Sequence, residues 1–398
     1  MILRALVFLL VIFNAVPALA DVRVSGKEIL VDGKPFQVRG AGGEQRLDLL
    51  KPLGATVVRT YGEPPDAILD QAQKLGLKVV VGFWLEHPRR GFNYRDPAQA
   101  NAQLERLAAF VKRYRDHPAL LMWGVGNEVE AELDDDSAVW PGIGQAARLV
   151  RELDPRHPVM AVLAEAGGGK VARLIKAAPD VDVLGINSYG DALPSVPQRV
   201  RAQGWKGPLV VTEMGAIGQW QAQRKPWGAM IEPSSTAKAA LLRGYLAALG
   251  PTTEGQILFY WGQKQEVTPT WHSLLLPDGS WTETAEAMAQ AWGGRTPGGN
   301  SAPRIGRFDM EAGRAVLEVA DPDGDVMSVN WSVMAESTDL RKGGDIEAVP
   351  RHYAEALVSS DLTGAKLGTL PPGQYRLFVT VEDGRGAAAT ANLPFLVN

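Results

Sequence analysis

Short apolar runs alternate with longer stretches of mixed polarity from residue 36 to residue 292. The apolar runs are nearly continuous and rich in Val, Leu and Ile, which is typical of parallel strands that are buried on both faces. The runs that we interpret as strands cover residues 36–40, 56–61, 78–84, 120–126, 159–163, 183–187, 209–212 and 256–261.

The stretches between these runs have the spacing of amphipathic helices. The clearest of them cover residues 66–75, 98–115, 139–153 and 236–249. Asp96 and Ser234 stand at two of the expected helix starts, where a short polar side chain can cap the first free backbone amides. Eight strand–helix units in a row predict an α/β fold, a (β/α)8 TIM barrel. A doubly wound open sheet is the competing topology.

The segments on either side of the barrel have other patterns. Residues 22–38 alternate in polarity around a turn at residues 31–34, which predicts a hairpin that could plug the bottom of the barrel. Beyond the barrel, short alternating runs are separated by Gly, Pro and Asp turns, which predicts a small all-β sandwich of immunoglobulin-like size. These runs cover residues 315–319, 327–333, 375–381 and 387–397.

We therefore divide the chain into four parts. They are a signal peptide (1–20), a barrel domain with its hairpin (21–296), a linker rich in Gly and Pro (297–303) and a β-sandwich module (304–398). In the last part, Asp321, Asp323 and Asp325 are spaced closely enough to bind calcium. Asp-rich segments of this kind are more often simple turns, and the sequence leaves both interpretations open.

The signal peptide is predicted from the first residues. Arg4 precedes an apolar stretch at residues 5–13, and Ala18-Leu19-Ala20 provides small residues for cleavage before Asp21. The alternative is an uncleaved anchor helix, but Asn14 and Pro17 leave the apolar run short for a membrane span. We expect a periplasmic or extracellular protein without membrane insertion after cleavage.

Composition narrows the classes of partner. The 398 residues are 45% hydrophobic and 22% charged, with a formal net charge of −4, so we expect a soluble globular protein and no nucleic-acid partner. The sequence has no cysteine, which excludes disulfides and a lipid anchor on a cysteine. We expect a monomer.

Two glutamates follow strand-like runs. Glu128 comes after MWGVGN and Glu213 comes after PLVVT, so each should lie at the carboxyl end of a strand, the fourth and the seventh of the barrel. These ends meet at one pocket, and a pair of carboxylates is the minimum equipment for cleaving a glycosidic bond. A separation of about 5 Å gives retention of configuration, and one of roughly 6.5–9.5 Å gives inversion. Taken alone, each glutamate is a weak signal, because an exposed glutamate in a loop is the more common explanation.

Other polar and aromatic residues near strand ends fit the same pocket. Arg59 can supply a positive charge to an ionised Glu213, and Tyr189 can donate a hydroxyl to it. Asn127 can contact a sugar hydroxyl. Aromatic side chains that could stack on sugar rings, or belong to the core, are Tyr61, Trp84, Tyr189 and Trp261 at strand ends and Trp220, Trp227 and Trp271 in later loops.

Other chemistries have little support. The five histidines show no metal-binding spacing. The sequence contains no GxSxG elbow, no GxGxxG and no P-loop. We expect no metal at the catalytic site and no cofactor.

Taken in order, HPALLMWGVGNEVE, LDPRHPVMAV, DVLGINSYGD and PLVVTEMGAIG closely resemble the barrel domain of family 2 glycoside hydrolases, within clan A. The resemblance implies that Glu128 is the acid/base and Glu213 the nucleophile. It further implies that Asn127 contacts the sugar 2-hydroxyl, Tyr189 orients the nucleophile and Trp261 forms the floor of the −1 subsite. Arg59 matches an arginine of strand two in several clan families.

The sequence also departs from family 2. The sugar-binding and sandwich domains that normally precede the barrel are replaced here by a hairpin, and AGGEQ stands where a histidine is common. Fungal-type β-1,3-glucanosyltransferases share the GNEV string and a similar nucleophile segment. The segments ADPDGDVMSVNWSV and PPGQYRLFVTVEDGRGAAA resemble the polycystic-kidney-disease-type module that is often appended to secreted carbohydrate enzymes.

These observations predict a secreted retaining β-glycoside hydrolase that acts through a glycosyl-enzyme intermediate, on a polysaccharide or oligosaccharide similar to β-glucan. The alternatives are a β-glucan transglycosylase that uses the same two glutamates, and a carbohydrate-binding barrel without catalysis. A structural protein of the cell envelope with a decayed barrel is a further alternative.

Overall fold

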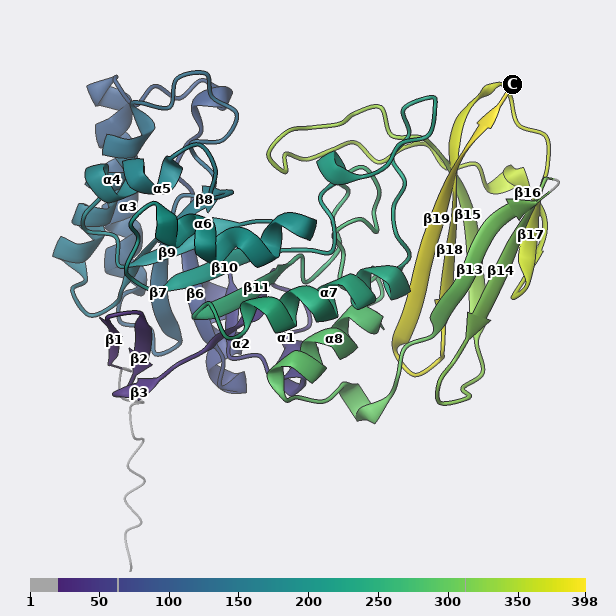
Figure 1. The fold of residues 1–398 in the computed structure, drawn as a ribbon, viewed down its shortest axis with the longest axis horizontal. Coiled ribbons are helices and arrows are strands. Elements are labelled where there is room, and N and C mark those ends of the chain that lie inside the picture. Colours follow the sequence, from purple (N-terminus) through teal and green to yellow (C-terminus); the bar gives the residue numbers. More distant parts are fainter. Residues whose placement is uncertain (1–20, 63, 312) are drawn as a thin grey trace, which may run out of the picture.

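The computed structural model describes residues 21–62, 64–311 and 313–398. The predicted signal peptide, residues 1–20, lies outside the described residues. Within them, eight parallel strands form a closed barrel with the order β10-β11-β4-β5-β6-β7-β8-β9 (Figure 1). The prediction of a TIM barrel is confirmed, and the alternative of an open sheet is wrong. The barrel strands are β4 (Val38–Gly42), β5 (Val57–Arg59), β6 (Lys78–Phe83), β7 (Leu120–Val125), β8 (Val159–Ala164), β9 (Val183–Asn187), β10 (Leu209–Met214) and β11 (Gly255–Phe259).

Each strand is followed by a helix on the outside of the barrel (Figure 1). The first unit has only one α-turn, and the others have longer helices. Asp96 caps α3 by accepting a hydrogen bond from Ala98 N, and Ser234 caps α7 by accepting one from Ala237 N, as predicted. The helices are α1 (Leu47–Leu50), α2 (Asp66–Leu75), α3 (Pro97–Tyr114), α4 (Val139–Leu153), α5 (Lys170–Ala177), α6 (Val196–Ala202), α7 (Ser235–Leu249) and α8 (Glu283–Trp292).

The predicted hairpin is a small three-stranded antiparallel sheet made by β1 (Val22–Ser25), β2 (Glu28–Val31) and β3 (Lys34–Pro35). Val22 and Ile29 of this sheet are buried in one apolar cluster with Val38, Met160 and Ile257 of the barrel strands. The hairpin therefore closes the amino-terminal end of the barrel, which leaves the opposite end for a site.

The tail is all-β, as predicted, and together with β12 from the barrel part it forms two four-stranded sheets (Figure 1). The strand order is β12-β19-β18-β15 in one sheet and β13-β14-β17-β16 in the other. Residues of β13, β16 and β17 were not predicted as strands, because they carry too few apolar positions for a periodic signal. The strands are β12 (Trp281–Thr282), β13 (Arg304–Glu311), β14 (Arg314–Ala320), β15 (Ser328–Ala335), β16 (Leu357–Asp361), β17 (Gly364–Leu367), β18 (Gly373–Glu382) and β19 (Ala387–Val397).

The sandwich is joined to the barrel by more than the linker. Strand β12 comes from the segment before α8 and pairs in parallel with β19, at Trp281 with Ala387 and at Thr282 with Ala388. The segment between the domains contains the 3-10 helix Pro297–Gly299. The barrel part of the chain therefore supplies one strand of a sandwich sheet.

A long loop of the sandwich, residues 336–353, extends from β15 back toward the barrel (Figure 1). We call it the β15–β16 loop. Its Asp345 forms ion pairs with Arg89 and Arg90, which follow β6. Its Glu347 is only 4% exposed and accepts a hydrogen bond of 2.6 Å from Val267 N, in the segment after β11. The loop thus contacts two barrel loops at the open end.

In the part of the chain described here, we find no helix that combines the length and apolarity needed to span a bilayer.

Candidate active site

The two glutamates lie at the carboxyl ends of their strands. Glu213 is the fifth residue of β10 and is 6% exposed. Glu128 follows β7 and is half-buried; its φ of 53° lies in the left-handed region, which a residue with a side chain adopts rarely and often at a functional site. A hydrogen bond of 3.0 Å from Glu128 N to Val162 O holds this conformation.

Glu213 is held by two charge-stabilising partners. Arg59 Nη1 donates to its Oε1 at 3.2 Å, and the Tyr189 hydroxyl donates to its Oε2 at 2.9 Å. Burial raises the pKa of Glu213 to about 7, with the nearby charge of Glu128 adding to the rise, whereas Arg59 and Tyr189 oppose it. The geometry is that of a carboxylate which the protein keeps ionisable in a buried place, as a nucleophile requires.

Glu128 has a neutral donor instead. Asn187 Nδ2 donates to Glu128 Oε1 at 2.7 Å. Burial raises the pKa of Glu128, and the hydrogen bond from Asn187 and the charge of Arg59 oppose this rise only in part. A carboxyl group with a raised pKa retains its proton at higher pH, which suits the donor of a proton to a leaving group.

One hydrogen-bonded network connects the two glutamates. Arg59 Nη2 donates to Asn127 Oδ1 at 2.6 Å, and Asn187 Nδ2 donates to the same oxygen at 3.1 Å. Thr212 Oγ1 donates to Asn187 Oδ1 at 2.8 Å, which turns the amide of Asn187 toward Glu128. The predicted residues Arg59, Asn127 and Tyr189 are therefore brought to the two glutamates.

Asn187 is not among the residues predicted from the sequence, although it donates a hydrogen bond to Glu128. The available signal was its position: it ends β9 and stands two residues before Tyr189. Residues two apart along an extended segment point to the same side, so the choice of Tyr189 as a site residue also indicated Asn187.

An aromatic cluster borders Glu213. The ring of Phe259, the last residue of β11, lies 6.0 Å from that of Tyr61, 6.5 Å from that of Tyr189 and 5.6 Å from that of His272. Arg59 lies 4.4 Å from the centre of the Tyr61 ring. Burial, and then the charge of Glu213, raise the pKa of Tyr61 well above its usual value. Phe259 is a site residue that the sequence analysis did not select.

Trp261 does not lie where the resemblance implied. It is 0% exposed and belongs to the core between the barrel and its helices, with Nε1 3.4 Å from Arg46 O. The structure therefore leaves this indole no open face for a sugar. The barrel strand ends at Phe259, and the cis peptide bond Phe259–Tyr260 follows it directly.

Trp84 lies at the edge of the site, next to the β15–β16 loop. The His87 ring lies 4.9 Å from its ring, and Arg90 lies 5.2 Å from it. Burial, and the charges of Arg89 and Arg90, lower the pKa of His87 to about 4, so this ring is neutral at neutral pH. Trp84 is half-buried under these neighbours, so it lies partly in the core and partly at the rim of the site. The sequence left both of these locations open.

The segment after β11 adds a charged pair. Lys264 Nζ lies 2.6 Å from Glu266 Oε2 and 5.3 Å from the centre of the Phe259 ring. Lys264 is one of the charges that lower the pKa of Glu213, although burial, which raises it, has the larger effect. The positive charge of Lys264 is therefore close enough to act on Glu213, but it is already paired with a carboxylate.

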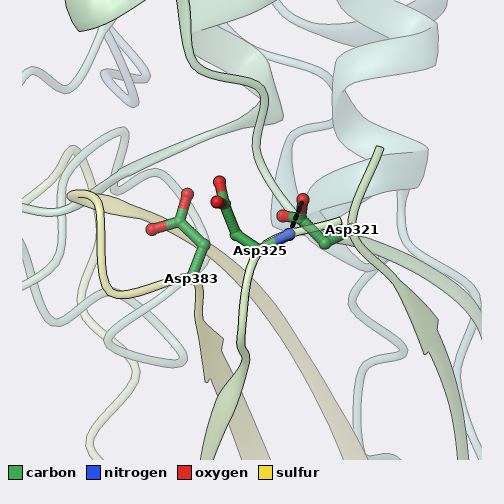
Figure 2. Close-up of side chains that lie close together, drawn as sticks. All are labelled: Asp321, Asp325 and Asp383. Carbon is green, nitrogen blue, oxygen red and sulfur yellow. Dashed lines mark hydrogen bonds between the residues drawn. The ribbon is translucent and has the colours of Figure 1, made fainter. Parts of the chain in front are cut away.

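The aspartates of the sandwich lie apart from this site. Asp321 and Asp325 come together with Asp383 of the β18–β19 turn, and not with Asp323 as the sequence analysis expected (Figure 2). Asp323 instead accepts a hydrogen bond of 2.6 Å from Ser301 N. The guanidinium of Arg385 lies 3.3 Å from Asp325 and supplies a positive charge beside the cluster. Calcium binding stays a prediction.

Comparison with known proteins agrees with this geometry. Residues 67–208 match the family described as glycosyl hydrolases family 2, TIM barrel domain. The predicted resemblance of the barrel to family 2 of clan A is confirmed. The resemblance of the tail to the polycystic-kidney-disease-type module stays a prediction.

Two curated relatives illustrate the likeness. The chain is 30% identical over 236 residues to a beta-glucuronidase of Paenibacillus borealis. The aligned region covers 49% of this chain and 38% of that protein. It is 31% identical over 242 residues to a beta-galactosidase of Aeromonas hydrophila, covering 51% of this chain and 22% of that protein. The chain thus spans well under half the length of these relatives.

Among solved structures, the beta-D-glucuronidase of Dictyoglomus thermophilum superposes with a TM-score of 0.56 at 20% identity, over 69% of this chain and 53% of that chain. The beta-glucuronidase of Bifidobacterium dentium gives a TM-score of 0.53 at 20% identity, over 69% of this chain and 49% of that chain. At this identity the likeness shows the fold.

Proposed function

We propose that this protein is a retaining β-glycoside hydrolase, with Glu213 as nucleophile and Glu128 as general acid/base. The observation that carries the proposal is that the two glutamates have different hydrogen-bond partners. Glu213 is bound by a guanidinium and a phenol, which favour its ionised form, whereas Glu128 is bound by an amide. Burial raises the pKa of both carboxyl groups, that of Glu213 to about 7, so the assignment of the two roles rests on these different partners and not on the pKa values.

The reaction then has two steps. A Glu213 carboxylate oxygen attacks the anomeric carbon, the glycosidic C–O bond breaks, and Glu128 gives its proton to the leaving oxygen. Glu128, now ionised, takes a proton from water, whose oxygen attacks the anomeric carbon and displaces Glu213. Arg59 and Tyr189 hold Glu213 in place before the first step and receive its negative charge again after the second.

For the substrate we propose a neutral β-linked glycan similar to β-glucan. The relatives named above include glucuronidases, whose names indicate acidic sugars, and a galactosidase. An acidic sugar needs a free cation in its pocket. The two cations that lower the pKa of Glu213, Arg59 and Lys264, are each paired with a glutamate already. This pairing favours a substrate without charge.

The test compares Glu213→Ala and Glu128→Ala with the wild-type protein on aryl β-glycosides and β-glucan oligosaccharides. We expect both variants to fold and to lose activity by several orders of magnitude. Azide should restore turnover of Glu213→Ala and give the α-glycosyl azide. Glu105→Ala, on the exposed face of α3, is the control and should remain fully active. Turnover at the wild-type rate in both glutamate variants would refute the proposal.

Two further measurements complete the proposal. The anomeric proton of the first product, followed by NMR, should show retention of configuration. Product analysis with added oligosaccharide acceptors separates hydrolysis from transglycosylation, which the same two glutamates can perform.

We also propose export through residues 1–20; expression in a bacterium with sequencing of the amino terminus should find a chain that begins near Asp21.

A further inference from the structure

We propose that Trp220 is a stacking platform for the sugar unit next to the one whose bond is broken, and so helps to determine the length of substrate that the protein prefers. This inference rests on the proposed function. Trp220 is 60% exposed, whereas Trp261 and Trp271 of the neighbouring segment are 0% and 3% exposed. Trp220 is thus an indole with an open surface beside the site.

The position of Trp220 ties it to the nucleophile. It lies in the 3-10 helix Gln219–Gln221, which follows β10, the strand that carries Glu213. Its ring centroid lies 5.4 Å from that of Tyr189, with the two ring planes at 86°. The hydroxyl of Tyr189 in turn donates to Glu213 at 2.9 Å. A single aromatic ring therefore separates the indole from the carboxylate.

The segment around Trp220 is fixed on both sides. Gln219 Nε2 donates to Glu266 Oε1 at 2.9 Å, and its Oε1 lies 3.2 Å from His272 Nε2. Gln221 Nε2 donates to Tyr189 O at 3.1 Å, and its Oε1 accepts from Gly218 N at 3.1 Å. Every one of these side-chain bonds orients the backbone that carries the indole.

Gly218 makes room for the indole. A Cβ atom at this position would lie 2.4 Å from the Trp220 ring, so only glycine lets the ring rest against the backbone. One side of the indole is thereby supported, and its edge contact with Tyr189 fixes the tilt. An isolated exposed aromatic residue needs no explanation, but one that is oriented by four hydrogen bonds and a required glycine is preorganised for a ligand.

The chemistry of sugars fits this surface. A pyranose ring of a β-linked glycan has an apolar face of C–H groups, which packs on an indole and removes apolar area from water. The ring that reacts must lie over Glu213, and Tyr189 occupies the space between Glu213 and Trp220. The indole can therefore stack on a neighbouring sugar unit of the glycan, and not on the sugar unit that reacts.

The test compares two substrates. β-Glucosyl fluoride has a single sugar ring and fills only the reacting subsite, whereas cello- and laminari-oligosaccharides also fill the neighbouring ones. In Trp220→Ala we expect kcat/KM for the oligosaccharides to fall about tenfold or more, mainly through KM, with that for the fluoride unchanged. Trp220→Phe should recover most of the loss. Val326→Ala, which removes a 90% exposed apolar side chain on the sandwich, is the control.

The outcomes separate this inference from the proposed function. Equal kinetics of Trp220→Ala and wild type on both substrates, or an equal loss on both, overturns the platform while the hydrolase stands. Titration calorimetry with the same oligosaccharides adds a measurement without catalysis. Weaker binding by Trp220→Ala than by wild type supports the platform even where neither protein turns the substrate over, which would refute only the hydrolase.

Discussion

Arg59 Nη1 lies 3.2 Å from Glu213 Oε1, and the two side chains are 3% and 8% exposed. An ion in such surroundings is stable only when a partner compensates the loss of water. Arg59 is therefore the group that lets Glu213 ionise inside the protein. Its other nitrogen, Nη2, holds Asn127 at 2.6 Å, so the same side chain also orders the residue beside Glu128.

Replacing Arg59 should disable the nucleophile. In Arg59→Met the pKa of Glu213 should rise above its value of about 7, because burial then acts without the opposing positive charge. We expect kcat/KM at pH 7 to fall by about 10²–10³-fold and the acid limb of the pH profile to move to higher pH. Arg23→Met, which removes an exposed arginine of the hairpin, should change neither. An unshifted acid limb in Arg59→Met would contradict this role.

The pH dependence of the wild type follows from the same groups. In the proposed mechanism Glu213 acts as an ion, so kcat/KM of the free protein should fall as the pH drops through about 7. In the same mechanism Glu128 acts as an acid, so kcat/KM should also fall as the pH rises through the raised pKa of Glu128. The result is a bell whose two apparent pKa values belong to the coupled pair.

Glu128→Gln tests this coupling directly. The charge of Glu128 raises the pKa of Glu213, so its removal should lower that pKa and move the ionisation of Glu213 to lower pH. The rate at which a 2-fluoroglycoside labels Glu213 reports this ionisation, since the attack needs the carboxylate. A labelling profile identical to that of the wild type would show that the two carboxylates do not interact.

Asn187 should influence the pH at which kcat/KM falls on the alkaline side. Its hydrogen bond of 2.7 Å to Glu128 stabilises the ionised form and lowers the pKa of Glu128. In Asn187→Ala that pKa should rise, so the alkaline limb of kcat/KM should move to higher pH while the acid limb changes little. Asn330→Ala, on an exposed position of β15, serves as the control. Movement of the alkaline limb to lower pH would contradict the assignment.

The barrel and the two glutamates could be predicted because their signals are local. Strands such as β7 and β10 are buried at every residue, which makes them continuous apolar runs in the sequence. A glutamate at the end of such a run must lie at the carboxyl end of the barrel. The same reasoning predicted that Arg59 and Tyr189 belong to the site, and the structure places both in contact with Glu213.

The remaining features depend on relationships that are distant in the sequence or sensitive to register. Phe259 is the last residue of β11 and Trp261 lies two residues beyond it, so the choice between them required the true end of the strand, which the apolar run over residues 256–261 does not mark. Asp383 joins Asp321 only because β18 and β19 form a hairpin beside it. The contact of Asp345 with Arg89 joins residues 256 positions apart, and no local pattern encodes it.

A buried ion pair lies at the junction of the two domains. Glu232 and Lys238 of the barrel part are 6% and 7% exposed and lie 2.5 Å apart, and Asn392 of β19 donates to Glu232 at 2.6 Å. Burial opposes the ionisation of Glu232, but the charge of Lys238 and the hydrogen bonds outweigh it and hold the pKa of Glu232 below its usual value. This stabilisation is complete above the pKa of the unfolded chain and is lost as the pH falls through the lower folded pKa.

Glu232→Gln should therefore reduce the free energy of unfolding at pH 7 by about 3–5 kcal/mol, because it leaves the buried charge of Lys238 without a carboxylate, with Thr270 O as its remaining hydrogen-bond acceptor. The loss should shrink as the pH falls through the lowered pKa of folded Glu232, because the wild type then also protonates this group. Urea unfolding at several pH values measures both effects. Glu311→Gln, which breaks a pair with Arg307 whose two side chains are 53% and 42% exposed, should cost about 1 kcal/mol or less. An equal cost for the two variants would show that the Glu232 pair contributes no more than a surface ion pair.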